Sequence, residues 1–289
     1  MTYQPVPATL DDVPALARMA ADAFRTDRQT QMKALGQARP FDMEKYALQA
    51  LPRDLARPRC VILKVVDPDT PGENNIMGYC NWGFHGFLLD DIPNNDVDEK
   101  SLPPPPPVKA TVDPPPPPPT VDITDPIQRL EQLTGADLQA WVDENNCEGG
   151  QCMFVIGLAV APEYQRRGVA RTLLQWGTDL CDKHNVSAWV HASEPSWPVY
   201  NKAGFEVVRT LDVDLDEYAP APPPSDEGPN AVWGHYVFRY MKFNPAGFAA
   251  TKVLYNFREY YYEPKGRNGL EDWWRYMLRC TSPARYPSE

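Results

Sequence analysis

The stretch Phe154–Ala170 reads FVIGLAVAPEYQRRGVA, and it decides how the middle of the chain folds. Its apolar first part predicts a buried strand, and Pro162 predicts a turn after that strand. A helical pattern over residues 171–184 follows, so the turn ends at a helix N-terminus with free backbone N–H groups. Such groups can bind a diphosphate, and Arg166 and Arg167 add positive charge. The stretch therefore predicts a binding site for a phosphorylated carrier.

Composition and charge limit the classes of protein to consider. The chain has 289 residues, and its hydrophobic fraction of 43% is enough for a large core. A net charge of −11 argues against binding to nucleic acid or to anionic membranes. Neither a signal peptide nor a membrane-spanning apolar stretch is evident. The six cysteines lack metal-ligand spacing, so we expect no metal and a reducing, cytoplasmic location, with the nucleus as an alternative.

The sequence predicts one mixed sheet with helices, which is an α/β or α+β fold. Helices are expected from Thr9 and over residues 27–51, 134–146 and 171–184, with a short helical segment over residues 194–203. Strands are expected at residues 60–66, 76–84, 151–160, 186–192, 204–211 and 231–243, the first two as an antiparallel hairpin. We expect a single domain over residues 1–243.

Two segments fall outside this pattern. Residues 88–125 are acidic and contain the proline runs Pro103–Pro107 and Pro114–Pro119, which favour polyproline II and exclude ladder pairing. We interpret them as an exposed insertion, a spacer or else a docking arm for a protein partner. Residues 244–289 form an aromatic-rich extension that could cover the sheet, bind a partner or line a pocket.

Two motifs resemble a known family. The pattern Leu158-Ala159-Val160-x-Pro162-x-x-Gln165-Arg166-Arg167-Gly168-Val169-Ala170 resembles the acetyl-CoA motif of the GCN5-related N-acetyltransferases, the GNAT family. The later Tyr200-Asn201-Lys202-Ala203-Gly204-Phe205 is similar to the downstream Y-x-x-x-G-F element of that family. The resemblance implies a twisted, mostly antiparallel mixed sheet whose fourth and fifth strands splay apart. The pantetheine arm of acetyl-CoA would enter that gap.

The resemblance also implies which residues hold the carrier. Backbone N–H groups of the turn would bind the diphosphate, and small residues at Gly168 and Ala170 would let the backbone approach it. The strand backbone near Leu158 would bind the pantetheine amides. The full carrier-binding set expected on this basis is Leu158, Ala159, Val160, Gln165, Arg166, Arg167, Gly168, Val169, Ala170, Arg171, Thr172 and Asn201.

The catalytic groups are less clearly indicated than the carrier site. Tyr200 is similar to the tyrosine that serves the family as general acid toward the departing sulfur. Members of the family often place a base on the fourth strand, but Phe154 and Ile156 take the expected inward positions here. His191, on the fifth strand, and Glu194, just after it, are the nearest candidates for that base. Packing alone is the alternative explanation for both Tyr200 and His191.

Three functions follow as alternatives. The first is an acetyl-CoA-dependent N-acetyltransferase for a small amine, such as an amino acid, polyamine, xenobiotic or secondary metabolite, by direct attack in a ternary complex. The second is an acetyltransferase for protein N-termini or lysines, and the third is a non-catalytic acyl-CoA-binding interaction module. We expect specificity to depend on the first two helices, on residues near Trp82–Phe87 and on the loop after Leu211. The sequence leaves the oligomeric state open.

Overall fold

A seven-stranded sheet forms the centre of the structure, in the strand order β1-β2-β3-β4-β5-β7-β6. The structure, a computed structural model, describes residues 3–36, 40–70, 75–93, 124–145 and 150–246. Its strands are β1 (Val6–Pro7), β2 (Cys60–Val66), β3 (Ile76–His85), β4 (Cys152–Val160), β5 (Ser187–Ala192), β6 (Glu206–Asp214) and β7 (His235–Phe243). Within the described ranges only β4 and β5 pair in parallel, so the sheet is mixed and mostly antiparallel.

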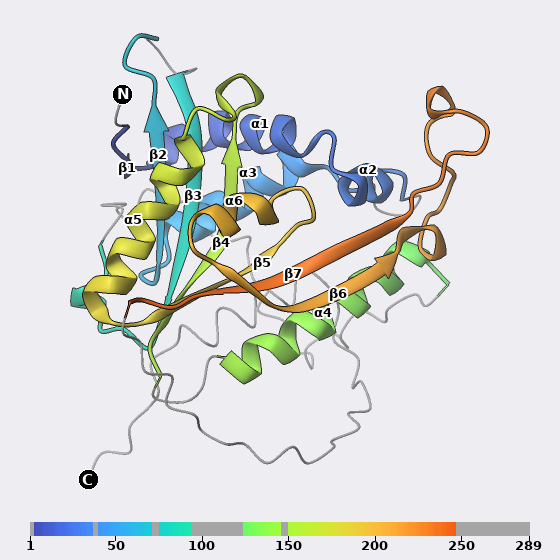
Figure 1. Ribbon diagram of the computed structural model, residues 1–289. Coiled ribbons are helices and arrows are strands. Elements are labelled where there is room, and N and C mark those ends of the chain that lie inside the picture. The colour runs from blue at the N-terminus through green and yellow to red at the C-terminus, as the bar shows by residue number, and fades with distance from the viewer. Residues whose placement is uncertain (1–2, 37–39, 71–74, 94–123, 146–149, 247–289) are drawn as a thin grey trace, which may run out of the picture.

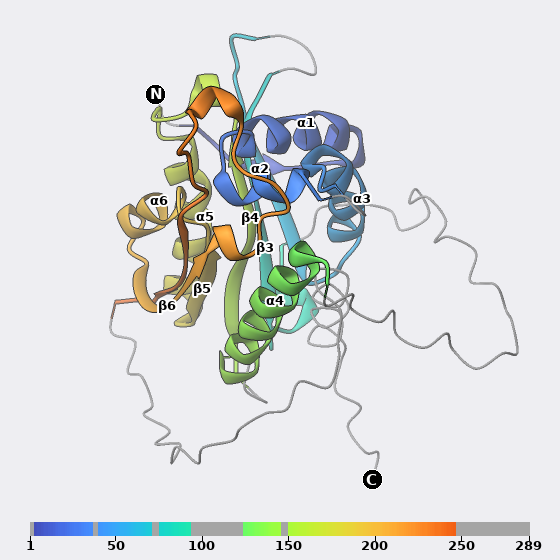
Figure 2. The same ribbon diagram turned by 90° about the vertical axis from the view of Figure 1, so that its right-hand side faces the viewer.

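Helices cover both faces of this sheet (Figure 1). They are α1 (Val13–Phe24), α2 (Arg28–Ala34), α3 (Met43–Leu55), α4 (Pro126–Asn145), α5 (Val169–His184) and α6 (Trp197–Lys202). Figure 2 shows α5 and α6 on one side of the sheet and the other four helices on the opposite side. The predicted fold class is thereby confirmed.

The face under α5 is closely packed around Trp82 of β3, which is fully buried. Leu173, Leu174 and Cys181 of α5 belong to the same apolar cluster. A Cβ atom at Gly177 would lie 2.2 Å from the Trp82 ring, so only a glycine lets the helix come this close. This close packing therefore fixes the N-terminus of α5 in place over the sheet.

The opposite face has several apolar clusters, and two of them border the space described below. Leu16 of α1 and Leu51 of α3 pack with Ile62 of β2. Farther along the sheet, Trp141 of α4 packs with the β4 and β5 side chains that face it, and its ring centroid lies 6.4 Å from that of Trp189. Polar groups and a cavity occupy the space between these two clusters, as described below.

The strands β4 and β5 separate halfway along their length. Their pairing runs from Cys152 opposite Ser187 to Val155 opposite Val190 and ends there. At the same level the register between β3 and β4 shifts, because Trp82 pairs with Val155. The next pair joins Asn81 to Gly157, which leaves Ile156 as an extra residue, a β-bulge. The expected splaying of the fourth and fifth strands is confirmed.

Some element boundaries differ from the sequence predictions. The segment 27–51 forms two helices, α2 and α3, each begun by an aspartate: Asp27 accepts a hydrogen bond from Thr30 N, and Asp42 from Lys45 N. The helix expected at 134–146 begins earlier, at Pro126, behind the capping residue Asp125. Both proline runs and all but the first three residues of the extension lie outside the described residues.

Cys60, Cys80, Cys152 and Cys181 are buried thiols. Burial raises the pKa of Cys60 and Cys80, and it raises the pKa of Cys181 to about 12. The thiols of Cys60, Cys80 and Cys181 therefore stay protonated at neutral pH and are poor nucleophiles. Cys147 and Cys280 lie outside the described residues.

Measured against membrane thickness, none of the helices in the described part of the chain is both long and apolar enough to span a bilayer.

Candidate active site

The loop between β4 and α5 presents backbone N–H groups to solvent. Arg166 has a φ of 62° and Gly168 a φ of 90°, so two residues of this loop are left-handed. The helix begins with a hydrogen bond from Thr172 N to Gly168 O of 3.0 Å. The N–H groups of residues 169–171 have no partner within the helix, as at any helix N-terminus. Left-handed residues before such an end can turn successive backbone N–H groups toward one anion.

A cavity of about 640 Å³ lies against this loop, and we call it the loop cavity. Its walls come from the end of α1, the second half of β4, the loop itself, and α6 with the segment before it. The residues that line it are Ala23, Phe24, Thr26, Asp27, Leu158, Ala159, Val160, Tyr164, Gln165, Arg166, Gly168, Val169, Ala170, Arg171, Ser193, Pro195, Ser196, Val199, Lys202 and Ala203.

Nine of the twelve predicted carrier-binding residues line the loop cavity; the exceptions are Arg167, Thr172 and Asn201. The Arg167 guanidinium instead lies over the Tyr164 ring, 5.3 Å from its centroid. The Tyr164 hydroxyl in turn donates to Asp67 Oδ2 at 3.1 Å. The structure thus places one loop arginine along the cavity and directs the other toward the β2–β3 turn.

Gly168 leaves room for a ligand to approach the backbone. A Cβ atom at this position would meet nothing within 4 Å. Gln165 shapes the loop from inside, because its Nε2 donates to Val160 O at 3.3 Å. The open backbone and the N–H groups of the first helical turn fit a diphosphate, which is the part of the predicted carrier that this loop would hold.

A second cavity, of about 320 Å³, lies on the face of the sheet covered by α1 to α4, and we call it the sheet cavity. Its floor includes Phe154, Ile156 and Gly157 of β4. The linings of the sheet cavity and the loop cavity share three residues, Phe24, Asp27 and Ser193. The two cavities therefore meet beside the point where β4 and β5 separate.

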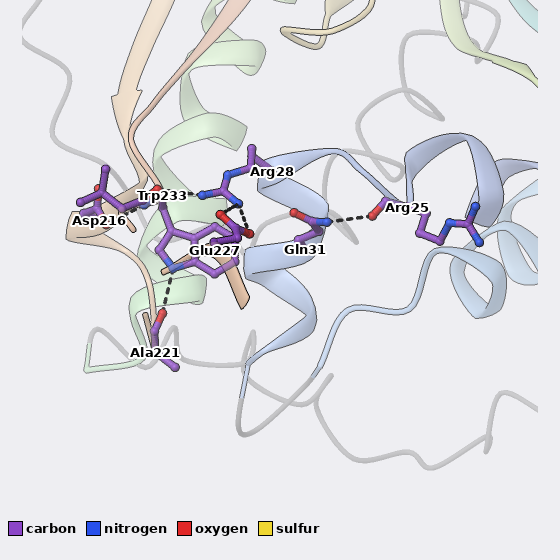
Figure 3. A network of polar contacts seen from close by, with 8 residues as sticks. Arg25, Arg28, Gln31, Asp216, Ala221, Glu227 and Trp233 are labelled. Atoms are coloured by element: carbon purple, nitrogen blue, oxygen red, sulfur yellow. Dashed lines mark hydrogen bonds and ion pairs between the residues drawn. The ribbon is translucent and has the colours of Figure 1, made fainter. Parts of the chain in front are cut away.

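A polar contact joins α2 to the loop between β6 and β7 (Figure 3). Arg28 Nη1 donates to both carboxylate oxygens of Glu227, at 2.8 and 2.9 Å, and Nη2 donates to Val232 O at 2.7 Å. The same guanidinium lies over the Trp233 ring, 4.7 Å from its centroid. The guanidinium thus joins α2 to Glu227, Val232 and Trp233 of that loop, and this contact helps to set the position of α2 over the sheet.

Tyr200 lies on α6, where it is 4% exposed. Its ring packs edge to face on Phe205, with centroids 5.8 Å apart. Burial raises the pKa of Tyr200, so the phenol stays protonated and able to donate a hydrogen bond. Neither cavity includes Tyr200 in its lining, although its helix neighbour Val199 lines the loop cavity. Its role as general acid stays a prediction.

His191 and Glu194 have different surroundings. His191 lines the sheet cavity, and its ring stacks against Phe238 and Tyr240, with centroid distances of 5.0 and 4.6 Å. Its Nε2 has no hydrogen-bond partner among the described residues, and burial lowers its pKa to about 4, so the ring is neutral. Glu194 lines neither cavity and accepts a hydrogen bond from Val237 N at 3.3 Å.

Two buried polar residues in the sheet cavity were missed by the sequence reasoning. Asp54 and Asn81 are each 2% exposed, and Asn81 Nδ2 donates to Asp54 Oδ2 at 2.7 Å. Asn81 left a signal, since it is a polar residue inside the apolar strand β3. Asp54 left none, because it follows Pro52 beyond the expected end of its helix.

The expected specificity residues are only partly correct. The first helices do line the sheet cavity, but Trp82, Phe84 and Phe87 belong to the core cluster under α5. That part of the prediction is wrong, because alternate residues of β3 face opposite sides of the sheet. Tyr79 and Asn81 of the same strand face the cavity instead.

Residues 135–205 match the family described as the Acetyltransferase (GNAT) family. The matched segment contains β4, the loop between β4 and α5, α5, β5 and α6, and most residues that line the loop cavity lie within it. The resemblance drawn from the sequence is thereby confirmed for this part of the chain. No curated protein sequence matches the chain.

Solved structures with a similar arrangement include three acetyltransferases. A putative arylalkylamine N-acetyltransferase 7 of the yellow fever mosquito is 16% identical, with a TM-score of 0.48 over 84% of this chain and 87% of that one. A histone acetyltransferase HPA2 and related acetyltransferase from Corynebacterium glutamicum is 14% identical, with a TM-score of 0.44 over 85% and 98%. A phosphinothricin acetyltransferase from Sinorhizobium meliloti, solved with AcCoA, is 11% identical, with a TM-score of 0.41 over 87% and 93%. These likenesses carry no argument about the substrate.

Proposed function

We propose that the chain is an acetyl-CoA-dependent N-acetyltransferase whose acceptor is the amine of a small molecule. One observation carries the proposal: two cavities meet where β4 and β5 separate, and they share Phe24, Asp27 and Ser193. The loop cavity suits a long carrier with a diphosphate, and the smaller sheet cavity suits a compact acceptor. Two substrates held on either side of one opening can react directly.

The residues around the loop would hold acetyl-CoA. The N–H groups after Gly168 and the left-handed Arg166 would bind the diphosphate, with the cationic side chains of Arg166 and Arg171 beside it. The strand segment Leu158–Val160 would bind the pantetheine amides through its backbone. When bound, the carrier supplies an acetyl thioester, whose carbonyl carbon accepts the amine.

The protein's own groups would orient the reactants and move protons. Tyr200, kept protonated by burial, is the proposed donor toward the departing sulfur. His191 faces the acceptor side, but its pKa of about 4 makes it a weak base, and it is better suited to accept a hydrogen bond. Glu194 is held by the β7 backbone, so we do not assign the base to it.

A thiol-release assay with acetyl-CoA, small amines and short peptides tests the proposal. We expect coenzyme A release with small amines and much slower release with peptides. Binding of coenzyme A to the full chain, measured by calorimetry, is the parallel readout. Release with peptides alone would support a protein acetyltransferase instead, and binding without release from any acceptor would support a non-catalytic module.

A further inference from the structure

We propose that the sheet cavity binds a primary amine with an aromatic body in its ammonium form, and that Asp54 contacts the nitrogen and takes its proton. This inference rests on the proposed function and names the substrate class and a further catalytic residue. It starts from three properties of the cavity: aromatic walls, an excess of carboxylates, and buried acceptor atoms without donors.

Aromatic rings dominate the walls of the sheet cavity. Its lining includes Phe24, Phe41, Tyr46, Phe154, Trp189 and Phe238. Some of these rings are already ordered by stacking, since Phe154 and Trp189 are parallel with centroids 5.1 Å apart. A flat apolar ligand buries its surface against such walls, whereas an extended polyamine would leave them uncovered.

The charged groups in the same lining favour a cation. Three carboxylates, Asp27, Asp54 and Glu131, accompany one lysine, Lys33. Lys33 Nζ lies 2.7 Å from Glu131 Oε1, so this pair is internally neutralised. Asp27 is held by neutral donors: Tyr236 OH at 2.8 Å, Thr30 N at 2.9 Å and the Thr30 hydroxyl at 2.8 Å. Asp54 is paired with Arg57, which is not part of the lining, so the lining itself keeps an excess of carboxylates.

Asp54 and Asn81 each present an acceptor atom that lacks a donor. Asp54 Oδ1 lies 3.0 Å from Arg57 Nη1, an ion pair whose angles do not make a hydrogen bond. Asn81 Oδ1 has no hydrogen-bond partner among the described residues. Each buried unsatisfied acceptor is costly. An ammonium group carries several N–H donors and could satisfy both atoms at once.

The position of this pair along the sheet suits the reaction. Asn81 is the cross-strand partner of Gly157, at the bulge of β4. Gly157 lines the sheet cavity, and the next residue, Leu158, lines the loop cavity. An amine bound to Asp54 and Asn81 is therefore next to the strand segment along which the carrier would lie.

The surroundings of Asp54 tune it for proton transfer. Burial is the main cause that raises its pKa to about 7, while Arg57, Arg53 and the Asn81 amide act in the opposite direction. The neighbouring Cys60 thiol and Tyr79 phenol have raised pKa values and stay neutral. A base with a pKa near the working pH is well matched to general base catalysis.

The proton balance is then simple. The ionised carboxylate of Asp54 takes one proton from the ammonium group, and the nitrogen lone pair forms the C–N bond as the C–S bond breaks. The bond electrons leave with the sulfur. Of the two protons that the nitrogen loses, one goes to the departing sulfur, and Asp54 passes the other to water.

Binding measurements on the full chain test the inference with 2-phenylethylamine, its neutral analogue 2-phenylethanol, and spermidine. We expect the Asp54→Asn variant to bind 2-phenylethylamine at least tenfold more weakly, with unchanged affinity for 2-phenylethanol and coenzyme A. The matched control is Asp12→Asn, which removes a carboxylate paired with Lys64 at 2.5 Å, outside both cavities. Equal affinity of the Asp54→Asn variant and the wild type for 2-phenylethylamine would overturn the inference.

A second measurement needs no variant. In the wild type, 2-phenylethylamine should bind several-fold more weakly at pH 5.5 than at pH 8, because the carboxyl is protonated at the lower pH. Equal affinity at both values, or tighter binding of spermidine than of 2-phenylethylamine, would overturn the inference. If thiol release with other amines is the same in the wild type and in the Asp54→Asn variant, this inference fails and the proposed function stands. No release with any amine would defeat the proposed function itself.

Discussion

Replacing Gly168 with glutamate should abolish binding of coenzyme A while the protein stays folded. Gly168 has a φ of 90°, and a Cβ there would meet nothing within 4 Å, so the new side chain fits without a clash. The folding cost is the left-handed strain of about 1–2 kcal/mol. For a chain of this size that corresponds to a fall in Tm of about 2–4 °C per kcal/mol.

The binding cost comes from charge. Two unit charges about 4 Å apart near a protein surface repel by about 4 kcal/mol, and each 1.4 kcal/mol is about tenfold in affinity. The glutamate carboxylate would face the diphosphate at the helix N-terminus, so we expect the Kd of coenzyme A to rise at least about a hundredfold. Isothermal titration calorimetry measures the Kd, and circular dichroism follows the Tm.

Two further variants separate strain from charge. Gly168→Ala introduces the strain without the charge and should weaken binding far less. Gly228→Glu adds the same charge at another glycine with positive φ, 103°, where a Cβ also meets nothing within 4 Å. Gly228 lies outside the loop cavity, so affinity for coenzyme A should not change. A folded Gly168→Glu protein with a Kd within threefold of the wild type would refute the proposed loop site.

Three other predictions follow from the core and the site. Tyr200→Phe should keep affinity for coenzyme A and lower kcat by about a hundredfold or more, as for a missing general acid; unchanged thiol release would remove Tyr200 from the mechanism. Gly177→Ala should destabilise the fold by about 1–3 kcal/mol in denaturant titrations, because its Cβ would lie 2.2 Å from the Trp82 ring. The control is Gly157→Ala, where a Cβ has open space, so the fold should not be destabilised. Equal losses of stability in the two variants would argue against the packing explanation. The pKa of the Asp54 carboxyl rises from 3.8 to about 7 on folding. The contribution of this group to the free energy of unfolding is therefore fully present below pH 4 and is lost as the pH rises through 7. Wild-type Tm relative to Asp54→Asn should therefore be lower at pH 8 than at pH 5, and a constant difference would contradict the buried titration.

The residues of the loop cavity were predictable because they lie close together in the sequence. An apolar strand, a turn and the N-terminus of α5 form one short segment, and its resemblance to the family motif supplied nine of the lining residues. The helix expected at 134–146 was too short, because its capping residue, Asp125, lies next to a proline-rich segment that obscured the boundary.

The residues that line the sheet cavity could not be predicted in the same way. Its lining combines side chains from helices and strands that are distant in sequence, such as Asp54 and Asn81. Their partnership depends on which face of β3 each residue occupies, and the β4 bulge at Ile156 shifts that register. A single sequence gives the alternation along each strand but not the packing of α3 against it.

The contact between Arg28 and Glu227 has a consequence for folding during synthesis. The two residues are 199 positions apart, so synthesis must run almost to β7 before they can meet. A polypeptide that stops short of that glutamate also lacks β7, whose residues Tyr236 and Phe238 line the sheet cavity. The sheet cavity is therefore completed only after β7 has been made.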